Sequence, residues 1–324
     1  MRISLTKSVG FTIISLSFIY LLWVGYQQWG EFAQNFPHKT LWWGLLIAII
    51  AYASACGLLL TLAWYKIILF LGGQITLVDS IKIYGRSQVA KYLPGNVFHY
   101  VGRHLLAKEM GLPNGIIVFS ALLEAVLLII VALGLTVFSL VLYGWHYDLK
   151  YELAKPWFFL VMILASLILL LFIYNFPLSI KKYLSKDDWL INLDHIPFSR
   201  IVTTLIYVSV IYLTFFTTIG LLLWLLAQNI TPVINGRVLV FIIAYSFSWA
   251  IGFITPGAPG GIGIREALLV ALLSPIMGGE AQAIILALIF RIATISGDGV
   301  FFITTCFIGS NNKQATHESN GWID

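Results

Sequence analysis

The sequence predicts an all-α integral membrane protein with about six full spans and two broken or re-entrant helical hairpins in an inverted repeat. The first observation is composition: 60% of the 324 residues are hydrophobic and 10% are charged, whereas soluble proteins carry about 25% charged residues. The second is a mean hydropathy of +0.92, distributed over uncharged runs long enough to cross a bilayer. The third is a pair of Pro-Gly breaks inside apolar sequence.

Charge and composition also exclude some classes of function. The net charge is +5, but no soluble module is present that would offer a basic face to nucleic acid. We therefore expect no nucleic-acid partner, and we relate the positive charge to anionic lipid and to membrane topology.

The two breaks repeat at a fixed spacing. Pro94-Gly95 lies nine residues before Arg103 and Pro256-Gly257 lies nine residues before Arg265, and the offset, 256 − 94 = 162, is half of 324. We interpret this as an internal duplication with halves of about 1–150 and 157–308, although coincidence stays open as the alternative. The residues that break the helices are Pro94, Gly95, Pro256, Gly257, Pro259, Gly260, Gly261 and Gly263. Broken backbone at membrane depth is tolerated only where it is buried in protein or lines a wet cavity.

The remaining elements follow from where charges interrupt the apolar sequence. We expect full spans at residues 9–26, 41–65, 116–143, 157–174, 201–227 and 281–308, because each is a long apolar run. The first run lacks the small-residue cleavage site of a signal peptide, so we expect it to be retained. Basic residues interrupt 66–115 without leaving a full crossing, and we expect hairpins there and at 238–278. Residues 1–308 then form a single transmembrane domain, and the polar tail 309–324 is expected to be disordered.

Lysine and arginine positions predict the orientation, because cytoplasmic loops carry an excess of these residues. With a cytoplasmic N-terminus, thirteen Lys and Arg residues fall on the cytoplasmic side and five on the other. We therefore expect a multi-pass protein of the cell (inner) membrane with its N-terminus in the cytoplasm. Three spans separate the hairpins, so the hairpins enter from opposite sides and the two halves are inverted. The inversion holds if each hairpin instead crosses fully, since the number of crossings stays odd.

Charged and polar side chains near the breaks and within the spans are the candidate substrate-binding residues: Arg103, Arg265, Glu266, Arg291, Glu124, Asp298, Asn96 and His99. Glu124 and Arg291 lie roughly 12 and 15 Å along their spans at 1.5 Å per residue. Both positions are near the middle of a core about 30 Å thick, where a charge is costly unless it is paired or hydrated.

Arginine suits phosphate because its guanidinium binds phosphate oxygens as a fork, and helix starts after each break add N–H donors. We expect Arg103 and Arg265 to hold a phosphate, and the carboxylates to balance charge or carry a proton. Two alternatives remain. The charges neutralise one another as buried structural pairs, or, for His99, the ring is a hydrogen-bonded interface residue rather than a functional one.

The sequence contains no HExxH, no GxSxG, no Walker loop and no paired metal cluster, and the glycines at 260–263 lack the strand context of a nucleotide fingerprint. We expect no enzymatic activity, no cofactor and no metal. Cys56 and Cys306 lie in apolar segments and are expected to be packing residues.

Two stretches carry a resemblance to a known family: Thr255-Pro-Gly-Ala-Pro-Gly-Gly-Ile-Gly-Ile-Arg-Glu-Ala267 and Lys91-Tyr-Leu-Pro-Gly-Asn-Val-Phe-His-Tyr-Val-Gly-Arg103. They resemble the lysylphosphatidylglycerol synthase transmembrane-region family over roughly residues 9–309. In its best-known relatives this region is the flippase part of the multiple-peptide-resistance factor, which moves aminoacylated phosphatidylglycerol between leaflets. The resemblance implies lipid handling, with Arg103, Arg265, Glu266 and Arg291 as motif positions.

The resemblance also has a departure, because those relatives carry a soluble aminoacyltransferase after the membrane part. The sequence here ends at Asp324, so we expect no synthase activity. Stand-alone members also resemble proteins found beside glycosyltransferases, which leaves a polyprenyl-linked or glycosylated lipid open as the substrate.

Our main hypothesis is therefore that the protein is a flippase-like lipid translocase. A phospholipid or lipid-linked glycan passes between leaflets through a polar cavity between the hairpins. One alternative is a membrane-embedded enzyme acting on a lipid phosphate with Glu266 or His99 as base. The other is a non-transporting accessory partner of a glycosyltransferase. Expected partners are a membrane lipid and either a glycosyltransferase or a second copy of the chain.

Overall fold

The computed structural model describes residues 40–93, 97–146, 197–231, 237–255 and 258–308. Within these ranges all regular structure is helical, which confirms the predicted all-α membrane protein. The expected spans at 9–26 and 157–174 and the tail 309–324 lie outside the described residues. So do four break residues, Pro94, Gly95, Pro256 and Gly257, and the candidate Asn96. The total of six spans therefore stays a prediction.

Four long apolar helices of the described ranges can cross a membrane. The first is continuous from α3 (Thr40–Ala55) through a π-helical turn, η1 (Cys56–Leu60), to α4 (Thr61–Phe70). The others are α7 (Asn114–His146), α9 (Phe198–Gln228) and α12 (Glu280–Phe307). They coincide with four of the predicted spans to within a few residues.

The first of these helices is longer than expected, since it runs past Lys66 to Phe70 instead of ending at 65. The Lys66 ammonium lies 5.7 Å from the centroid of the Tyr65 ring and 5.6 Å from that of Tyr207. Aromatic rings and a long aliphatic stem allow a lysine near a span end to keep its charge at the interface. A single lysine at this position therefore does not end the helix.

Short helices occupy both predicted hairpins. The first contains α5 (Leu77–Gln88), the 3₁₀ turn η2 (Val89–Tyr92) and α6 (Phe98–Glu109). The second contains α10 (Val238–Ile254), the 3₁₀ turn η6 (Pro259–Gly261) and α11 (Ile264–Leu273). Three glycines of the second break have positive φ: Gly260 at 56°, Gly261 at 74° and Gly263 at 84°. Only glycine adopts such angles without strain, which explains why this break is so rich in it.

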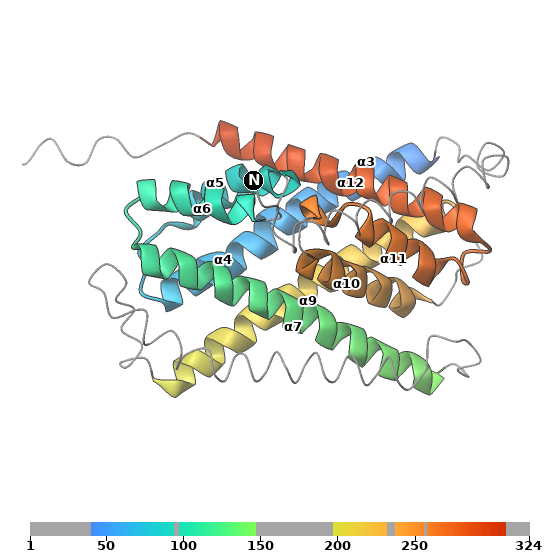
Figure 1. Cartoon of the computed structure of the whole chain (residues 1–324), viewed down its shortest axis with the longest axis horizontal. Helices are drawn as coiled ribbons and strands as arrows, with labels where there is room; N and C mark the ends of the chain where they lie inside the picture. The colour runs from blue at the N-terminus through green and yellow to red at the C-terminus, as the bar shows by residue number, and fades with distance from the viewer. Residues whose placement is uncertain (1–39, 94–96, 147–196, 232–236, 256–257, 309–324) are drawn as a thin grey trace, which may run out of the picture.

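The described elements follow the same order in each half: a long helix, two short helices and a second long helix. In Figure 1, α7 runs from left to right while α12 runs from right to left, and α3–α4 and α9 likewise run in opposite directions. The pair α5 and α6 lies toward one end of the long axis, and α10 and α11 lie toward the other.

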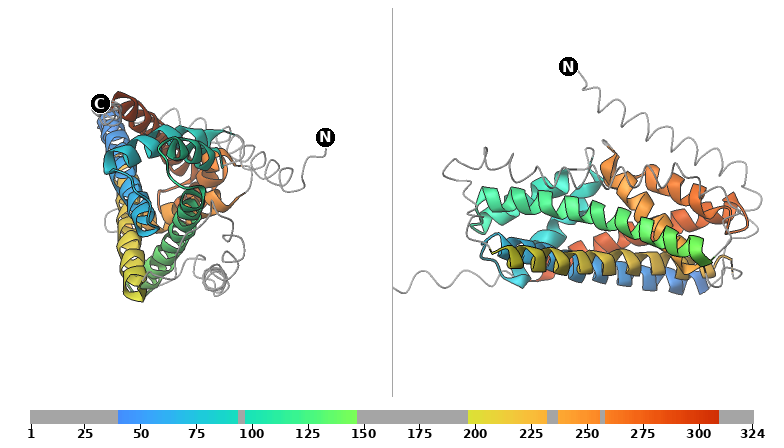
Figure 2. Two further views of the ribbon diagram at one scale, coloured as in Figure 1. Left: turned by 90° about the vertical axis from the view of Figure 1, so that its left-hand side faces the viewer. Right: turned by 90° about the horizontal axis from the view of Figure 1, so that it is seen from below.

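The halves pack against each other through their last long helices. Helix α12 packs on α3 and α5 of the first half, and α7 packs on α10 and α9 of the second. The end-on view in Figure 2 shows a three-sided outline, with α7 and α9 meeting at one edge and α3 beside α12 at another. The 3₁₀ turns η2 and η6, which flank the two breaks in the sequence, contact each other within this bundle.

Candidate functional site

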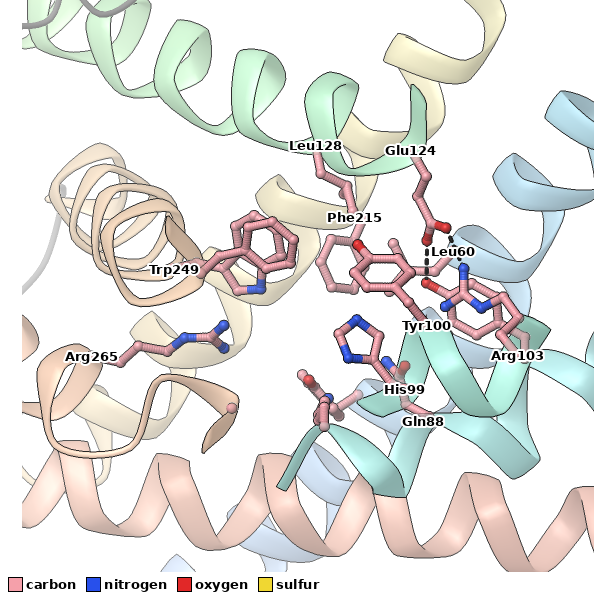
Figure 3. A pocket seen from close by; sticks show the side chains of 15 residues that line it. Leu60, Gln88, His99, Tyr100, Arg103, Glu124, Leu128, Phe215, Trp249 and Arg265 are labelled. Carbon is pink, nitrogen blue, oxygen red and sulfur yellow. Dashed lines mark hydrogen bonds and ion pairs between the residues drawn. The ribbon is translucent and has the colours of Figure 1, made fainter. Parts of the chain in front are cut away.

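A cavity of about 50 Å³ lies between the short helices of the two halves. Figure 3 shows residues of its lining, which comes from α3, η1, α5, η2, α6 and α7 of the first half and from α9, α10, η6 and α11 of the second. Both break-proximal arginines, Arg103 and Arg265, line it, together with Glu124, His99 and Gly260. A second cavity, of about 20 Å³, is lined by Arg265, Glu266 and Arg291. The candidates from both halves are thus brought together, with Arg265 lining both cavities.

Arg103 and Glu124 form a buried ion pair between α6 and α7, with 2% and 1% of their side chains exposed. The Tyr84 hydroxyl donates to Glu124 Oε1 at 2.7 Å. The Arg103 guanidinium carbon lies 3.9 Å from the centroid of the Tyr84 ring, and the Trp64 and Tyr100 rings lie within 5.5 Å. A carboxylate and three aromatic rings therefore surround this arginine, and its charge is compensated inside the protein.

A second ion pair joins the first hairpin to the last helix. Lys91 Nζ lies 2.7 Å from Asp298 Oδ2, and the Tyr92 hydroxyl donates to the same oxygen at 2.5 Å. Asp298 is fully buried, whereas 15% of the Lys91 side chain is exposed. Among the described residues, Asp298 Oδ1 has no hydrogen-bond partner. The contact links η2 of one half to α12 of the other.

The third carboxylate, Glu266, fixes the second break. Its Oε2 accepts from the Gly263 N–H at 2.6 Å, so it satisfies a free donor at the start of α11. Its Oε1 lies 3.3 Å from Arg291 Nε, and Arg291 Nη1 donates to the Gly260 carbonyl at 3.2 Å. Glu266 and Arg291 therefore hold the glycine turn against α12.

Arg265 differs from the other two arginines. Within the described ranges it forms no ion pair, whereas Arg103 pairs with Glu124 and Arg291 pairs with Glu266. The Nε atoms of all three arginines lack a hydrogen-bond partner among the described residues. Its guanidinium carbon lies 5.4 Å from the centroid of the Trp249 ring, and in Figure 3 the group points into the cavity. A Cβ on Gly252 would lie 2.6 Å from Arg265 Cγ, so this glycine gives the side chain the room to extend past α10.

His99 is buried, with 6% of its surface exposed, and lies between Arg103 and Arg265 in Figure 3. Its ring packs on Tyr100 at a centroid distance of 4.0 Å. No described residue makes a hydrogen bond to its Nδ1. Of the eight predicted residues, seven are thus placed around the two cavities or in ion pairs beside them, and Asn96 lies outside the described residues.

Four residues at the site were not among those predicted from the sequence: Tyr84, Lys91, Tyr92 and Trp249. Lys91 gave the same signal as Arg103, a cation inside an apolar hairpin beside a break. The aromatic residues gave no separate signal, because Trp and Tyr are also common at the ends of spans. Within the described part of the chain, no group of three or more His, Cys, Asp or Glu is placed to hold a metal ion.

The family model described as the lysylphosphatidylglycerol synthase TM region matches residues 8–297, a range that contains both breaks and every candidate residue except Asp298. No curated protein matches the chain.

Proposed function

Because the chain belongs to the lysylphosphatidylglycerol synthase transmembrane-region family, we propose that this multi-pass membrane protein is a lipid translocase. A lipid headgroup, from a phospholipid or a lipid-linked glycan, enters between the two hairpins while its hydrocarbon chains stay in the bilayer. The lipid moves from one leaflet to the other without covalent change.

One observation carries this proposal: Arg265, which forms no ion pair with any described residue, extends its guanidinium into a cavity that both halves line. An uncompensated charge in the interior of a membrane protein is costly, and such charges usually serve a substrate or ion pathway. Guanidinium is the side chain best suited to phosphate because it donates two parallel hydrogen bonds. A phosphate headgroup is therefore the counter-charge that completes this site.

The helix directions support an alternating-access route. The halves have the same element order, and their long helices run in opposite directions, as expected for an inverted duplication. Two inverted halves have two near-equivalent packings that open a shared site to opposite sides. The Lys91–Asp298 and Glu266–Arg291 pairs join α12 to both breaks, so we propose that they rearrange when the site changes sides. We also propose an inner-membrane location, with the N-terminus in the cytoplasm.

Purified protein in vesicles tests the function directly. Fluorescent phospholipid is placed in both leaflets, and a reductant that does not cross the membrane bleaches the outer leaflet. We expect the inner-leaflet signal to fall faster than in vesicles without protein. If no phospholipid and no lipid from a native extract moves faster than in empty vesicles, the proposal is wrong.

Mass spectrometry of the same lipids separates translocation from the enzymatic alternative. We expect every lipid mass to be unchanged after incubation, since the Glu266 carboxylate is already bound by the Gly263 N–H and by Arg291. A lipid that gains or loses a headgroup would favour an enzyme. A glycosyltransferase or a second copy of the chain remains the proposed protein partner, testable by co-purification from the native membrane.

A further inference from the structure

Lys91 lies between a buried carboxylate and the larger cavity. Its Nζ is 2.7 Å from Asp298 Oδ2, and its side chain lines the cavity together with Arg265. The Lys91 side chain is 15% exposed, whereas that of Arg103, which is enclosed with its own carboxylate, is 2% exposed. A lysine carries a compact charge on a flexible four-carbon stem. Lys91 is therefore able to turn from Asp298 toward a ligand in the cavity.

Two aromatic rings flank the Lys91 ammonium. It lies 5.4 Å from the centroid of the Tyr92 ring and 6.0 Å from that of Tyr52. Tyr52 also lines both cavities. Because aromatic faces attract cations, these rings stabilise the ammonium while it changes partner.

Asp298 differs from the other two carboxylates at the site in having an oxygen without a described partner. Both oxygens of Glu124 and both oxygens of Glu266 have a hydrogen-bond or ion-pair partner. In Asp298, Oδ2 contacts both Lys91 and the Tyr92 hydroxyl. Its Oδ1 has no hydrogen-bond partner among the described residues, although the side chain is fully buried. Buried polar atoms are nearly always hydrogen-bonded, so Oδ1 is the carboxylate oxygen with a place for a proton.

From these contacts we propose that Lys91 exchanges Asp298 for the lipid phosphate, and that Asp298 binds one proton at Oδ1 when the lysine leaves. The inference rests on the proposed function, because it adds a second phosphate ligand to the site and names the ion that is coupled to transport. The phosphate is then held by Lys91 of one half and Arg265 of the other.

The proton removes the cost of the exchange. Breaking a buried ion pair leaves an uncompensated charge, which is strongly unfavourable, and a buried carboxylate avoids that charge by becoming neutral. A hydronium ion transfers its proton to Oδ1, so that an O–H bond forms and a water molecule remains. When the lipid leaves on the other side, the O–H bond breaks, the proton passes to water there, and Lys91 pairs with the carboxylate again. One proton therefore crosses with each lipid, in the same direction.

The other groups around Asp298 do not replace Lys91 as its cation. The titratable and charged groups that face Asp298 or its helix are Lys91 and Tyr92 of η2, Tyr52 of α3, Cys56 of η1, Tyr245 of α10, Arg86 of α5, Glu266 of α11 and Arg291 of α12 itself. Tyrosine and cysteine side chains are ordinarily neutral near pH 7. Arg86 donates to the Thr305 carbonyl, about two turns further along α12, and Arg291 is paired with Glu266. Among the described residues, Lys91 is thus the cation that compensates Asp298.

Proton uptake on lipid binding tests the exchange without transport. The purified full chain, in weakly buffered detergent near neutral pH, is mixed with phosphatidylglycerol, and a pH-indicator dye reports the protons taken up. We expect about one proton to be taken up for each lipid bound. Lipid that binds without proton uptake overturns the inference, and so does a failure of phosphatidylglycerol to bind.

Two variants assign the proton and the phosphate contact to their side chains. Asp298→Asn has no titratable group at this position, so we expect it to bind phosphatidylglycerol without proton uptake. The double variant Lys91→Gln/Asp298→Asn removes the ion pair without leaving a buried charge. We expect it to bind phosphatidylglycerol about tenfold more weakly than Asp298→Asn alone, because the second phosphate ligand is lost.

Asp79→Asn and Arg200→Gln are the matched controls. Asp79 belongs to another Asp–Lys pair, with Lys82, that does not line either cavity, and Arg200 lies on the exposed start of α9. Both controls should bind the lipid with native affinity and native proton uptake, and unfolding midpoints show that each variant is folded. A folded Asp298→Asn protein that still takes up a proton contradicts the inference, as does a double variant that binds as tightly as Asp298→Asn.

The vesicle assay keeps the two proposals apart. Valinomycin with equal potassium on both sides holds the membrane potential at zero. A pH difference of about one unit should then concentrate phosphatidylglycerol about tenfold in the leaflet that faces the more alkaline side, but not in vesicles with Asp298→Asn. Lipid that moves without regard to the pH difference would refute the coupling and leave the translocase intact. Proton uptake on binding with no lipid movement would refute the translocase and leave the exchange intact.

Discussion

Arg103 and Arg265 occupy matching positions in the two halves, each nine residues after a Pro-Gly pair, yet their surroundings differ. Arg103 has a carboxylate, a hydrogen-bonded tyrosine and three aromatic rings around it. Arg265 instead lies over the Trp249 ring and faces the cavity. The position that corresponds to Glu124, at 124 + 162 = 286, is Leu286, which is fully buried. The second half therefore has no acid at the position equivalent to Glu124, the residue that neutralises Arg103 in the first half.

This difference separates a structural arginine from one that is available to a ligand. The Arg103–Glu124 pair joins α6 to α7 and is complete without substrate. Arg265 carries a charge that the described protein does not balance. Variants that remove a charged partner, add one, or shift one of the arginine side chains test this difference.

Glu124→Gln leaves Arg103 buried without its counter-charge. Breaking a buried pair by removing one partner costs about 3–5 kcal/mol, so we expect a large fall in the free energy of unfolding. The measurement is unfolding of the purified protein in detergent. Glu109→Gln, on the exposed end of α6, is the control and should change stability by less than about 0.5 kcal/mol. Similar small losses for both variants would mean that the pair is not a structural contact.

Asp298→Asn tests the pair that links η2 to α12. We expect a loss of about 1–3 kcal/mol, as for other buried hydrogen-bonded groups. The loss should be smaller than for Glu124→Gln because Lys91 is partly exposed and can be hydrated. The same unfolding experiment measures it, and a loss larger than that of Glu124→Gln would contradict the ranking.

Ala287→Asp adds a carboxylate beside Arg265 that is not already in an ion pair. Ala287 lines the smaller cavity beside Arg265, so the new carboxylate competes with a lipid phosphate for the guanidinium. We expect translocation of phosphatidylglycerol to fall about tenfold, which corresponds to about 1.4 kcal/mol. Ala287→Asn, of nearly the same size but uncharged, is the matched control. Equal rates for the two variants would show that charge balance at Arg265 does not matter.

Gly252→Ala shifts the Arg265 side chain without changing any charge. The added Cβ would lie 2.6 Å from Arg265 Cγ, which forces a flexible side chain away from its rotamer at about 0.5–1.5 kcal/mol. We expect a fall of roughly two- to tenfold in translocation at nearly constant stability. Gly134→Ala on α7, where no neighbouring atom lies within 4 Å, is the control. An unchanged rate for Gly252→Ala would mean that the position of Arg265 is not critical.

Sequence patterns were sufficient to locate the elements. Uncharged runs placed four described spans, and proline with glycine placed the hairpins, because both signals depend only on local sequence. The one clear difference, the extension past Lys66, arose because the rings of Tyr65 and Tyr207 shield that charge, and Tyr207 is distant in sequence.

The ion pairs between charged side chains could not be predicted from local sequence in the same way. The depth of Glu124 in its span follows from residue counting, but its partner depends on how α6 and α7 rotate against each other. Lys91 was recognised as basic, yet its contact with Asp298 spans the two halves. The sequence left open whether these arginines form buried structural pairs or bind phosphate. Arg103 forms such a pair, whereas Arg265 forms none with the described residues, and its role as a phosphate ligand is our proposal.

The most direct test of this account is Arg265→Gln, with translocation and unfolding measured in the same preparation. We predict a translocation rate at least tenfold below that of the native protein and of Arg200→Gln. The unfolding midpoint should equal or exceed the native one, because a buried charge that no described residue pairs has been removed. A folded Arg265→Gln protein that moves phosphatidylglycerol at the native rate would contradict the central role of this guanidinium.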